Sequence, residues 1–197
     1  MNKSTSENNR RGFLSKMLVA GASSIALFSS SAYAKGSRAS GGNTTPKLTK
    51  EQKDELFFIY QEEKLARDVY ITLSEEYPEE NTFASIQLSE QRHIDAAQGL
   101  CEKYGIDISE VNEDEVGNFV LPVLQGYYDN LVEQGMKSLL DALEVGVFIE
   151  ELDIGDLTHA IEDLGMPADV INVYENLREG SYNHLESFQG AIKIASS

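Results

Sequence analysis

The 197-residue sequence has few basic side chains and almost no cysteine. Its 16 lysines and arginines stand against 33 aspartates and glutamates, which gives a formal net charge of −17. Binding to nucleic acid needs clustered basic side chains, so this deficit argues against a nucleic-acid partner and equally against a membrane-surface role. The single cysteine, Cys101, cannot form an internal disulfide. The fold must therefore rest on its core or on a bound metal.

Motifs of several other chemistries are missing as well. The sequence has no Gly-rich phosphate loop, no C-x-x-C pair and no nucleophile elbow. It has no alternating apolar run and no Asn-Gly hairpin turn, so no β-strand is predicted. The length suits one compact domain or two small ones.

The first 34 residues have the pattern of an export signal. A twin arginine at 10–11 precedes Phe-Leu at 13–14, an apolar run follows over 17–28, and Ser-Ala-Tyr-Ala at 31–34 is a small-x-small cleavage site. The run is too short and too rich in small residues to span a bilayer. The segment resembles a twin-arginine signal, with an ordinary secretory signal as the alternative. We expect a periplasmic or extracellular protein that is not integrated into the membrane once the signal is removed.

Removing residues 1–34 leaves 12 lysines and arginines against 32 aspartates and glutamates, so the formal charge becomes −20. The resemblance to twin-arginine signals implies export in the folded state, often with a cofactor already inserted. Residues 35–49 are rich in Gly, Ser, Thr and Lys, which predicts a flexible linker. The folded domain is expected over 50–197.

Four long amphipathic helices are predicted in that domain. Apolar residues recur at three- and four-residue intervals, the spacing of one helical face, over 50–77, 83–104, 137–164 and 167–194. The connection over 105–136, which contains a short helical piece near 121–133, suits a crossover that returns the chain to the other end of a bundle. The pattern predicts an all-α, ferritin-like four-helix bundle with a long crossover between its second and third helices.

Individual residues predict the helix ends. Pro78 should stop the first helix, Thr82 should be the N-cap of the second, and Gly105 should close it. Pro167 suits the first turn of the last helix. Gly180, in the middle of that helix, costs about 1 kcal/mol relative to Ala, so close packing or a kink is expected there.

The inward-facing stripe of each helix carries an acid or a histidine. These candidate metal ligands are Glu63, Glu90 with His93, Glu150 or Glu151, and His184. A buried ionised carboxylate is costly unless it is paired, hydrogen-bonded or bound to a metal, and several in one core repel each other. A cation among them removes both costs.

Four motifs in order carry a family resemblance. They are EEKLARDVY, SEQRHID, FIEELDIGDL and YENLREGSYNHLESF, spread over about 56–188. The first resembles the E-x-x-A-R-x-x-Y helix of rubrerythrin-type members of the ferritin-like superfamily, and the second matches that superfamily's E-x-x-H. Together they resemble a prokaryotic ferritin-like family catalogued as a domain of unknown function. The resemblance implies that Glu63, Glu90 and His93 are metal ligands.

The third and fourth helices match that pattern less well. Glu150 lies on the apolar stripe, whereas Glu151 repeats the acid-to-Asp offset of the first helix, and we slightly prefer Glu151. The fourth helix should carry a second E-x-x-H, but Ser181 stands at the Glu position before His184. A standard di-iron centre thus lacks one carboxylate. A single metal, or an asymmetric pair completed by Glu150 and Glu151 together, remains open.

Other residues are expected to be structural. We expect Asp153 to lie on a solvated face, and Cys101 to be a small buried apolar residue. Tyr70 should belong to the core and could serve in electron transfer to a redox-active metal.

The expected function is an exported protein that binds iron, or alternatively manganese, in a mononuclear or dinuclear site. Carboxylates with imidazole suit both metals, and the lack of thiolates argues against an iron–sulfur centre. If the protein is an enzyme, a metal-dependent oxidoreductase using O2 or peroxide, or a ferroxidase, is expected. The alternative is a metal-free helical interaction or stress-protective module of the cell envelope, which Ser181 favours. The oligomeric state is left open.

Overall fold

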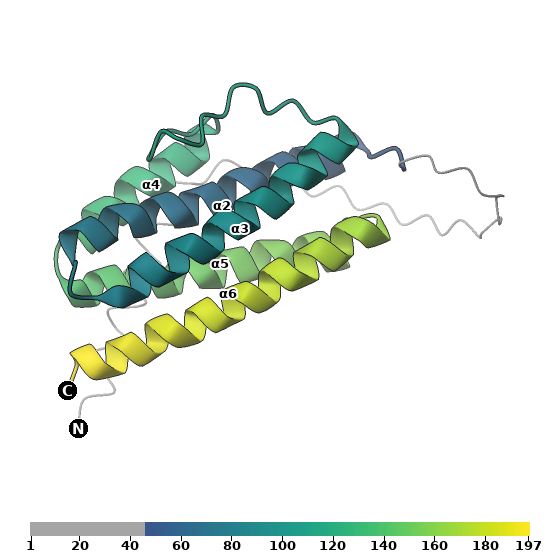
Figure 1. Cartoon of the computed structure of the whole chain (residues 1–197). Helices are drawn as coiled ribbons and strands as arrows, with labels where there is room; N and C mark the ends of the chain where they lie inside the picture. Colours follow the sequence, from purple (N-terminus) through teal and green to yellow (C-terminus); the bar gives the residue numbers. More distant parts are fainter. Residues whose placement is uncertain (1–45) are drawn as a thin grey trace. The chain divides into compact units, whose positions relative to one another are not determined.

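The computed structural model describes residues 46–197, and this part of the chain contains five α-helices and no β-strand (Figure 1). The helices are α2 (Lys50–Glu76), α3 (Asn81–Tyr104), α4 (Pro122–Gly135), α5 (Leu139–Glu162) and α6 (Ala168–Ala195). The all-α prediction is confirmed. The export signal predicted at 1–34, and the linker up to 45, lie outside the described residues. None of the helices within 46–197 is both long and apolar enough to cross a bilayer.

Residues just before the predicted boundary at residue 50 already take part in the fold. The Thr49 hydroxyl accepts a hydrogen bond from the backbone N–H of Gln52, whose side chain accepts one from the backbone N–H of Thr49. This reciprocal pairing satisfies N–H groups that a helix N-terminus leaves free. Leu48 is buried in the core, so the end of the predicted linker already packs against the domain.

The start of α3 differs from its prediction. Its N-cap is Glu80, whose carboxylate accepts a hydrogen bond from the backbone N–H of Thr82, so Thr82 lies inside the helix. Gly105 ends α3 with φ +65°, a left-handed conformation that glycine adopts without steric cost. Pro167 directly precedes the first residue of α6, one position earlier than expected.

The four long helices pack in a ring. Helix α2 contacts α3 and α5, and α6 contacts the same two helices. Figure 1 shows that α2 and α6 run in one direction along the domain and α3 and α5 in the other. Neighbours in the ring are therefore antiparallel, and the interior between the four helices receives the inward face of each.

The connection between α3 and α5 returns along the length of the domain, as predicted, and includes α4, which packs against α2 and α5 (Figure 1). A buried ion pair on α2 holds this connection. Nζ of Lys64 donates to Oδ2 of Asp68 over 2.5 Å and to the backbone carbonyl of Glu115 over 2.9 Å. The backbone N–H of Gly117 donates to Oδ2 of Asp68 over 2.9 Å.

Candidate metal centre

Six ionisable side chains from the four long helices are buried together in the interior, and we call them the carboxylate–histidine cluster. None is more than 8% exposed. The cluster comprises Glu63 from α2, Glu90 and His93 from α3, Glu150 and Asp153 from α5, and His184 from α6.

Glu90 lies at the centre of the cluster. Its Oε2 is 2.9 Å from Nδ1 of His93, and its Oε1 is 2.9 Å from Nδ1 of His184. Glu90 and His93 share one face of α3 because they are three residues apart. The two imidazole rings stack with their centroids 5.3 Å apart. One carboxylate thus contacts histidines of two different helices.

Each histidine also faces a second carboxylate. Nδ1 of His93 is 3.2 Å from Oε2 of Glu63, and Nδ1 of His184 is 3.5 Å from Oε2 of Glu150. The Tyr70 hydroxyl donates a hydrogen bond to Oε1 of Glu150 over 2.6 Å. This hydroxyl orients Glu150 so that its other oxygen faces the histidine. Tyr70 is buried, as expected for a core residue.

The structure corrects the preference for Glu151. Glu150 is buried in the cluster, whereas Glu151 is exposed. Consecutive residues on an α-helix point about 100° apart, so only one of the two can face the interior. Glu150 and Glu151 therefore do not both face the interior, as the predicted asymmetric metal pair completed by the two of them would require.

Asp153 was expected on a solvated face, and this expectation is wrong. It is 5% exposed and accepts a short hydrogen bond from the Ser181 hydroxyl. Asp153 follows Glu150 by three residues, the same spacing that joins Glu90 to His93, and that spacing could have identified it. Asp153 on α5 thus lies opposite Ser181, the position on α6 where the resembled pattern has a glutamate.

Charges in the cluster shift the pKa values of its members strongly. Burial by itself raises the pKa of a carboxyl, but the contacts with His184 and His93 lower the pKa of Glu90 to about 2. Burial lowers the pKa of an imidazole, but Glu63 and Glu90 raise the pKa of His93 to about 11. Glu150 and Glu90 likewise raise the pKa of His184 to about 10. In the metal-free protein these raised pKa values favour the imidazolium form of both histidines, which offsets part of the negative charge of the carboxylates.

The other three carboxyls bind protons more tightly than usual. Burial, followed by repulsion from Glu90, raises the pKa of Glu150 to about 8. Burial also raises the pKa of Glu63. The pKa of Asp153 lies well above its ordinary value because of burial and repulsion from Glu63. The interior holds more carboxylates than its two histidines can neutralise.

Four oxygen and nitrogen atoms of the cluster are buried without a hydrogen-bond partner among the described residues. They are Oε1 of Glu63, Oε1 of Glu90, Oδ1 of Asp153 and Nδ1 of His184. The last of these lies 2.9 Å from Glu90, but the contact lacks hydrogen-bond geometry. Buried polar atoms of native proteins normally have a hydrogen-bond partner, so four such atoms without one, close together, need an explanation. A cation bound among them would supply it.

The closest group of candidate donors is Glu90, His93 and His184. One donor atom of each lies within 4.8 Å of the others. Oxygen and imidazole donors suit iron, manganese and zinc. Cys101 takes no part, because it is buried in the apolar core and donates to the carbonyl of Leu56.

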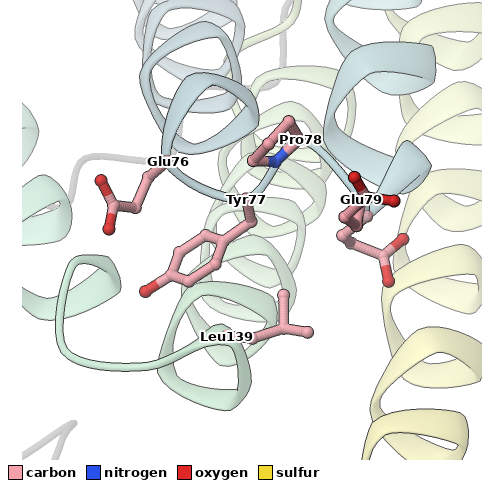
Figure 2. A pocket seen from close by; sticks show the side chains of 6 residues that line it. Glu76, Tyr77, Pro78, Glu79 and Leu139 are labelled. Carbon is pink, nitrogen blue, oxygen red and sulfur yellow. The ribbon is translucent and has the colours of Figure 1, made fainter.

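An open pocket lies elsewhere, where the α2–α3 turn meets the start of α5. Figure 2 shows Tyr77 and Pro78 at this turn, with Leu139 below them on α5, and the Tyr77 hydroxyl donates to the backbone carbonyl of Gly135 over 2.9 Å. Its remaining lining residues are three glutamates of the same turn, Glu76, Glu79 and Glu80. No member of the carboxylate–histidine cluster lines it.

Comparison with known proteins places the chain in a family. A family model described as an uncharacterized protein domain (DUF2202) matches residues 52–195. An uncharacterized protein of Methanocaldococcus jannaschii, MJ0754, is 45% identical over 141 residues, which cover 72% of this chain and 75% of that protein. The crystal structure of hypothetical protein MJ0754 from Methanococcus jannaschii DSM 2661 aligns with a TM-score of 0.74 at 41% identity, and the alignment covers 80% of this chain and 88% of that one. The chain therefore belongs to the DUF2202 family, described as an uncharacterized protein domain.

Proposed function

We propose that this protein is an exported, ferritin-like four-helix protein that binds two iron ions, or alternatively two manganese ions, in its carboxylate–histidine cluster. The observation that carries the proposal is the convergence of four carboxyls and two imidazoles from four helices, with several donor atoms left unpartnered. Without a cation, this arrangement would be less stable than an apolar core of similar volume.

The helix arrangement supports the ferritin-like part of the proposal. Ferritin-like bundles have one long crossover and place inward-facing carboxylates and histidines of all four helices around a shared site. Here the crossover joins α3 to α5, and the cluster draws on α2, α3, α5 and α6. The four motifs noted in the sequence lie on those same helices.

The donor set supports two metals. A dinuclear carboxylate site typically uses four carboxylates and two histidines. This chain has that number once Asp153 replaces the carboxylate that is missing at Ser181. Glu90, whose two oxygens face His93 and His184, would hold the metals together with these two histidines.

Iron or manganese in such a site supplies redox chemistry with O2 or peroxide, or oxidation of Fe(II) itself. The residues of the chain would orient the ligands and hold protons. Tyr70 keeps one oxygen of Glu150 occupied, and burial of all six ligands excludes bulk water. His93 and His184 must each lose one proton before a ring nitrogen can bind metal, so metal binding should release protons.

The competing hypothesis of a metal-free helical module also has an observation in its favour. The imidazolium ions of His93 and His184 already neutralise part of the buried negative charge through contacts with Glu90. In that case the cluster would be a structural ion-pair network, and its unpartnered oxygens would be a cost to stability.

Elemental analysis of the protein purified after export separates the two hypotheses. We expect stoichiometric metal in the unmutated protein, directly or after anaerobic Fe(II) loading, and its loss from the double variant Glu90→Ala, His93→Ala. The double variant Glu151→Gln, Glu75→Gln neutralises two exposed acids and should keep its metal. If the unmutated protein holds only traces of metal even after loading, the metal hypothesis is wrong.

A further inference from the structure

A second group of carboxyls lies beside the cluster, between α2 and α5. Glu62 of α2 is 2% exposed, and no N–H or hydroxyl group among the described residues donates a hydrogen bond to either of its oxygens. Its carboxyl lies against that of Asp156 on α5, close enough for the two to share a proton. A fully buried carboxyl facing a second carboxyl, with no donor group between them, is a costly arrangement unless a proton or a cation joins them.

Within residues 46–197, the charged side chains that influence Glu62 most strongly are themselves acids. Burial raises the pKa of Glu62 well above its ordinary value, and repulsion from Asp156 and then Asp153 raises it further. Tyr127 of α4 is also near, because Asp156 and Glu62 both raise the pKa of its phenol. The side chain that faces these acids with a compensating charge is His159, which is exposed and paired with Asp163 over 2.9 Å.

A row of acids on α2 and α5 couples this pair electrostatically to the surface and to the cluster, and Glu55 and Glu62 lie about two helical turns apart on one side of α2. Glu55, half-buried at the outer end, interacts with Asp156, and Asp156 adjoins Glu62. Glu62 then interacts with Asp153 and Glu63, which are both members of the cluster. The row thus alternates between α2 and α5 and ends at the proposed metal ligands.

We infer that Glu62 and Asp156 form a second cation site, with oxygen ligands only, through which a hard divalent cation passes from the surface near Glu55 into the carboxylate–histidine cluster. The fully buried, unpartnered oxygens of Glu62 carry this inference. Its role as a route rests on the proposed function, whereas the existence of the site does not. Carboxylates without imidazole suit Mn2+, Mg2+ and Ca2+.

The first test is the number of Mn2+ ions that the full-length protein binds, measured from the EPR signal of free Mn2+ at equilibrium. We expect the double variant Glu62→Gln, Asp156→Asn to bind one Mn2+ fewer than the unmutated protein. The control is the Glu75→Gln, Glu151→Gln variant, which changes net charge equally on the same two helices through exposed residues. If both variants bind the same number of Mn2+ ions, the second site does not exist.

The second test follows Co2+ uptake by the visible absorption that imidazole ligation produces. A row of acids that guides cations typically raises uptake rates by a factor of about ten or more, so the Glu62→Gln, Asp156→Asn variant should load that much more slowly than the control. Equal rates would overturn the route. Gln keeps the size and shape of the Glu62 side chain without its charge, and circular dichroism should confirm an intact fold.

A third variant, His93→Ala with His184→Ala, separates this inference from the proposed function. The second site contains no histidine, so this variant should still bind one Mn2+. Adding Glu62→Gln to the same variant should abolish that binding. If the unmutated protein shows no Co2+ absorption but the histidine variant still binds one Mn2+, the cluster is not a metal centre and the second site is nevertheless supported. Loss of all Mn2+ from the histidine variant would overturn an independent second site.

Discussion

Gly180 of α6 makes room for the imidazole of His93 on α3. A Cβ atom at position 180 would lie 2.6 Å from Nε2 of His93 and 2.7 Å from its Cε1, closer than carbon atoms approach. Nδ1 of the same ring contacts Glu63 and Glu90, so the ring is held from its other side. The close packing predicted at this mid-helix glycine is confirmed. Glycine at this position makes α6 about 1 kcal/mol less stable than alanine would, and its missing side chain leaves room for the ring.

Changing Gly180→Ala should therefore weaken metal binding without unfolding the protein. The added methyl group displaces His93 from Glu90, while the gain in helical propensity offsets part of the strain. We expect metal affinity to fall about tenfold or more, since misplaced ligands cost that much in metal sites. Titration with Co2+ together with thermal unfolding measures both effects.

Gly190 is the matched control on the same helix, because a Cβ there meets no atom within 4 Å. Gly190→Ala should raise stability by up to about 1 kcal/mol and leave Co2+ affinity unchanged. Equal Co2+ affinities in the two variants would contradict the role assigned to Gly180.

The variant Asp153→Asn should bind half as much metal in the cluster as the unmutated protein. The amide keeps the shape of the side chain and can still bond with Ser181, but it removes the charge that completes the set of four carboxylates. Elemental analysis after anaerobic Fe(II) loading gives the number of ions. The exposed neighbour Glu151 is the control, and Glu151→Gln should keep both ions. Full occupancy in Asp153→Asn would remove Asp153 from the ligand set.

The metal-free protein should lose stability as the pH rises from about 5 to about 9. Folding raises the pKa of Glu150 from 4.5 to about 8 and the pKa of His93 from 6.5 to about 11. A group with a raised pKa stabilises the fold fully below its unfolded pKa, and this contribution is lost as the pH rises toward the folded value. Glu90 behaves oppositely, since its pKa is lowered to about 2, but its contribution is lost only in strong acid.

Thermal unfolding of chelator-treated protein across this pH range measures the trend. The variant Glu150→Gln should flatten the part of the curve below about pH 8, because it removes one of the protons that only the folded state retains. A melting temperature that increases steadily between about pH 5 and pH 9 in the metal-free protein would be inconsistent with a cluster held by imidazolium ions.

The buried ion pair that holds the crossover should matter far more to stability than a similar pair on the surface. Changing Asp68→Asn leaves the fully buried Lys64 without its partner and weakens the bond to Gly117, so we expect a loss of about 3–5 kcal/mol in the free energy of unfolding. Asp54 pairs with Lys50 at the same spacing on the same helix but in solvent. Asp54→Asn should cost less than about 1 kcal/mol in urea unfolding. Similar losses in the two variants would contradict this account.

Much of the cluster could be predicted from helical periodicity alone. Glu63, Glu90, His93 and His184 each interrupt a narrow apolar stripe, and a narrow stripe defines which side of a helix faces inward. Their burial in the structure agrees with that prediction. Whether they bind a metal stays a prediction for the experiments above.

Periodicity could not choose between Glu150 and Glu151. Helix α5 packs against α2, α4 and α6, so apolar residues cover most of its circumference and the centre of its stripe is poorly defined. Asp153 and Glu62 were missed for a related reason. Each is identified by what lies opposite, Ser181 in one case and Asp156 in the other, and those contacts join different helices.

The sequence by itself determined the five helices, their order and the crossover, because caps, apolar spacing and the glycine and proline positions act within a few residues of each other. Only the tertiary structure chose Glu150 over Glu151 for the interior and showed that Asp153 and Glu62 are buried as well. That choice depends on how helices far apart in the chain are rotated against one another, and a rotation of about 100° exchanges one residue for the next. The chemistry proposed for this protein therefore depends on packing between helices, although each helix is encoded locally.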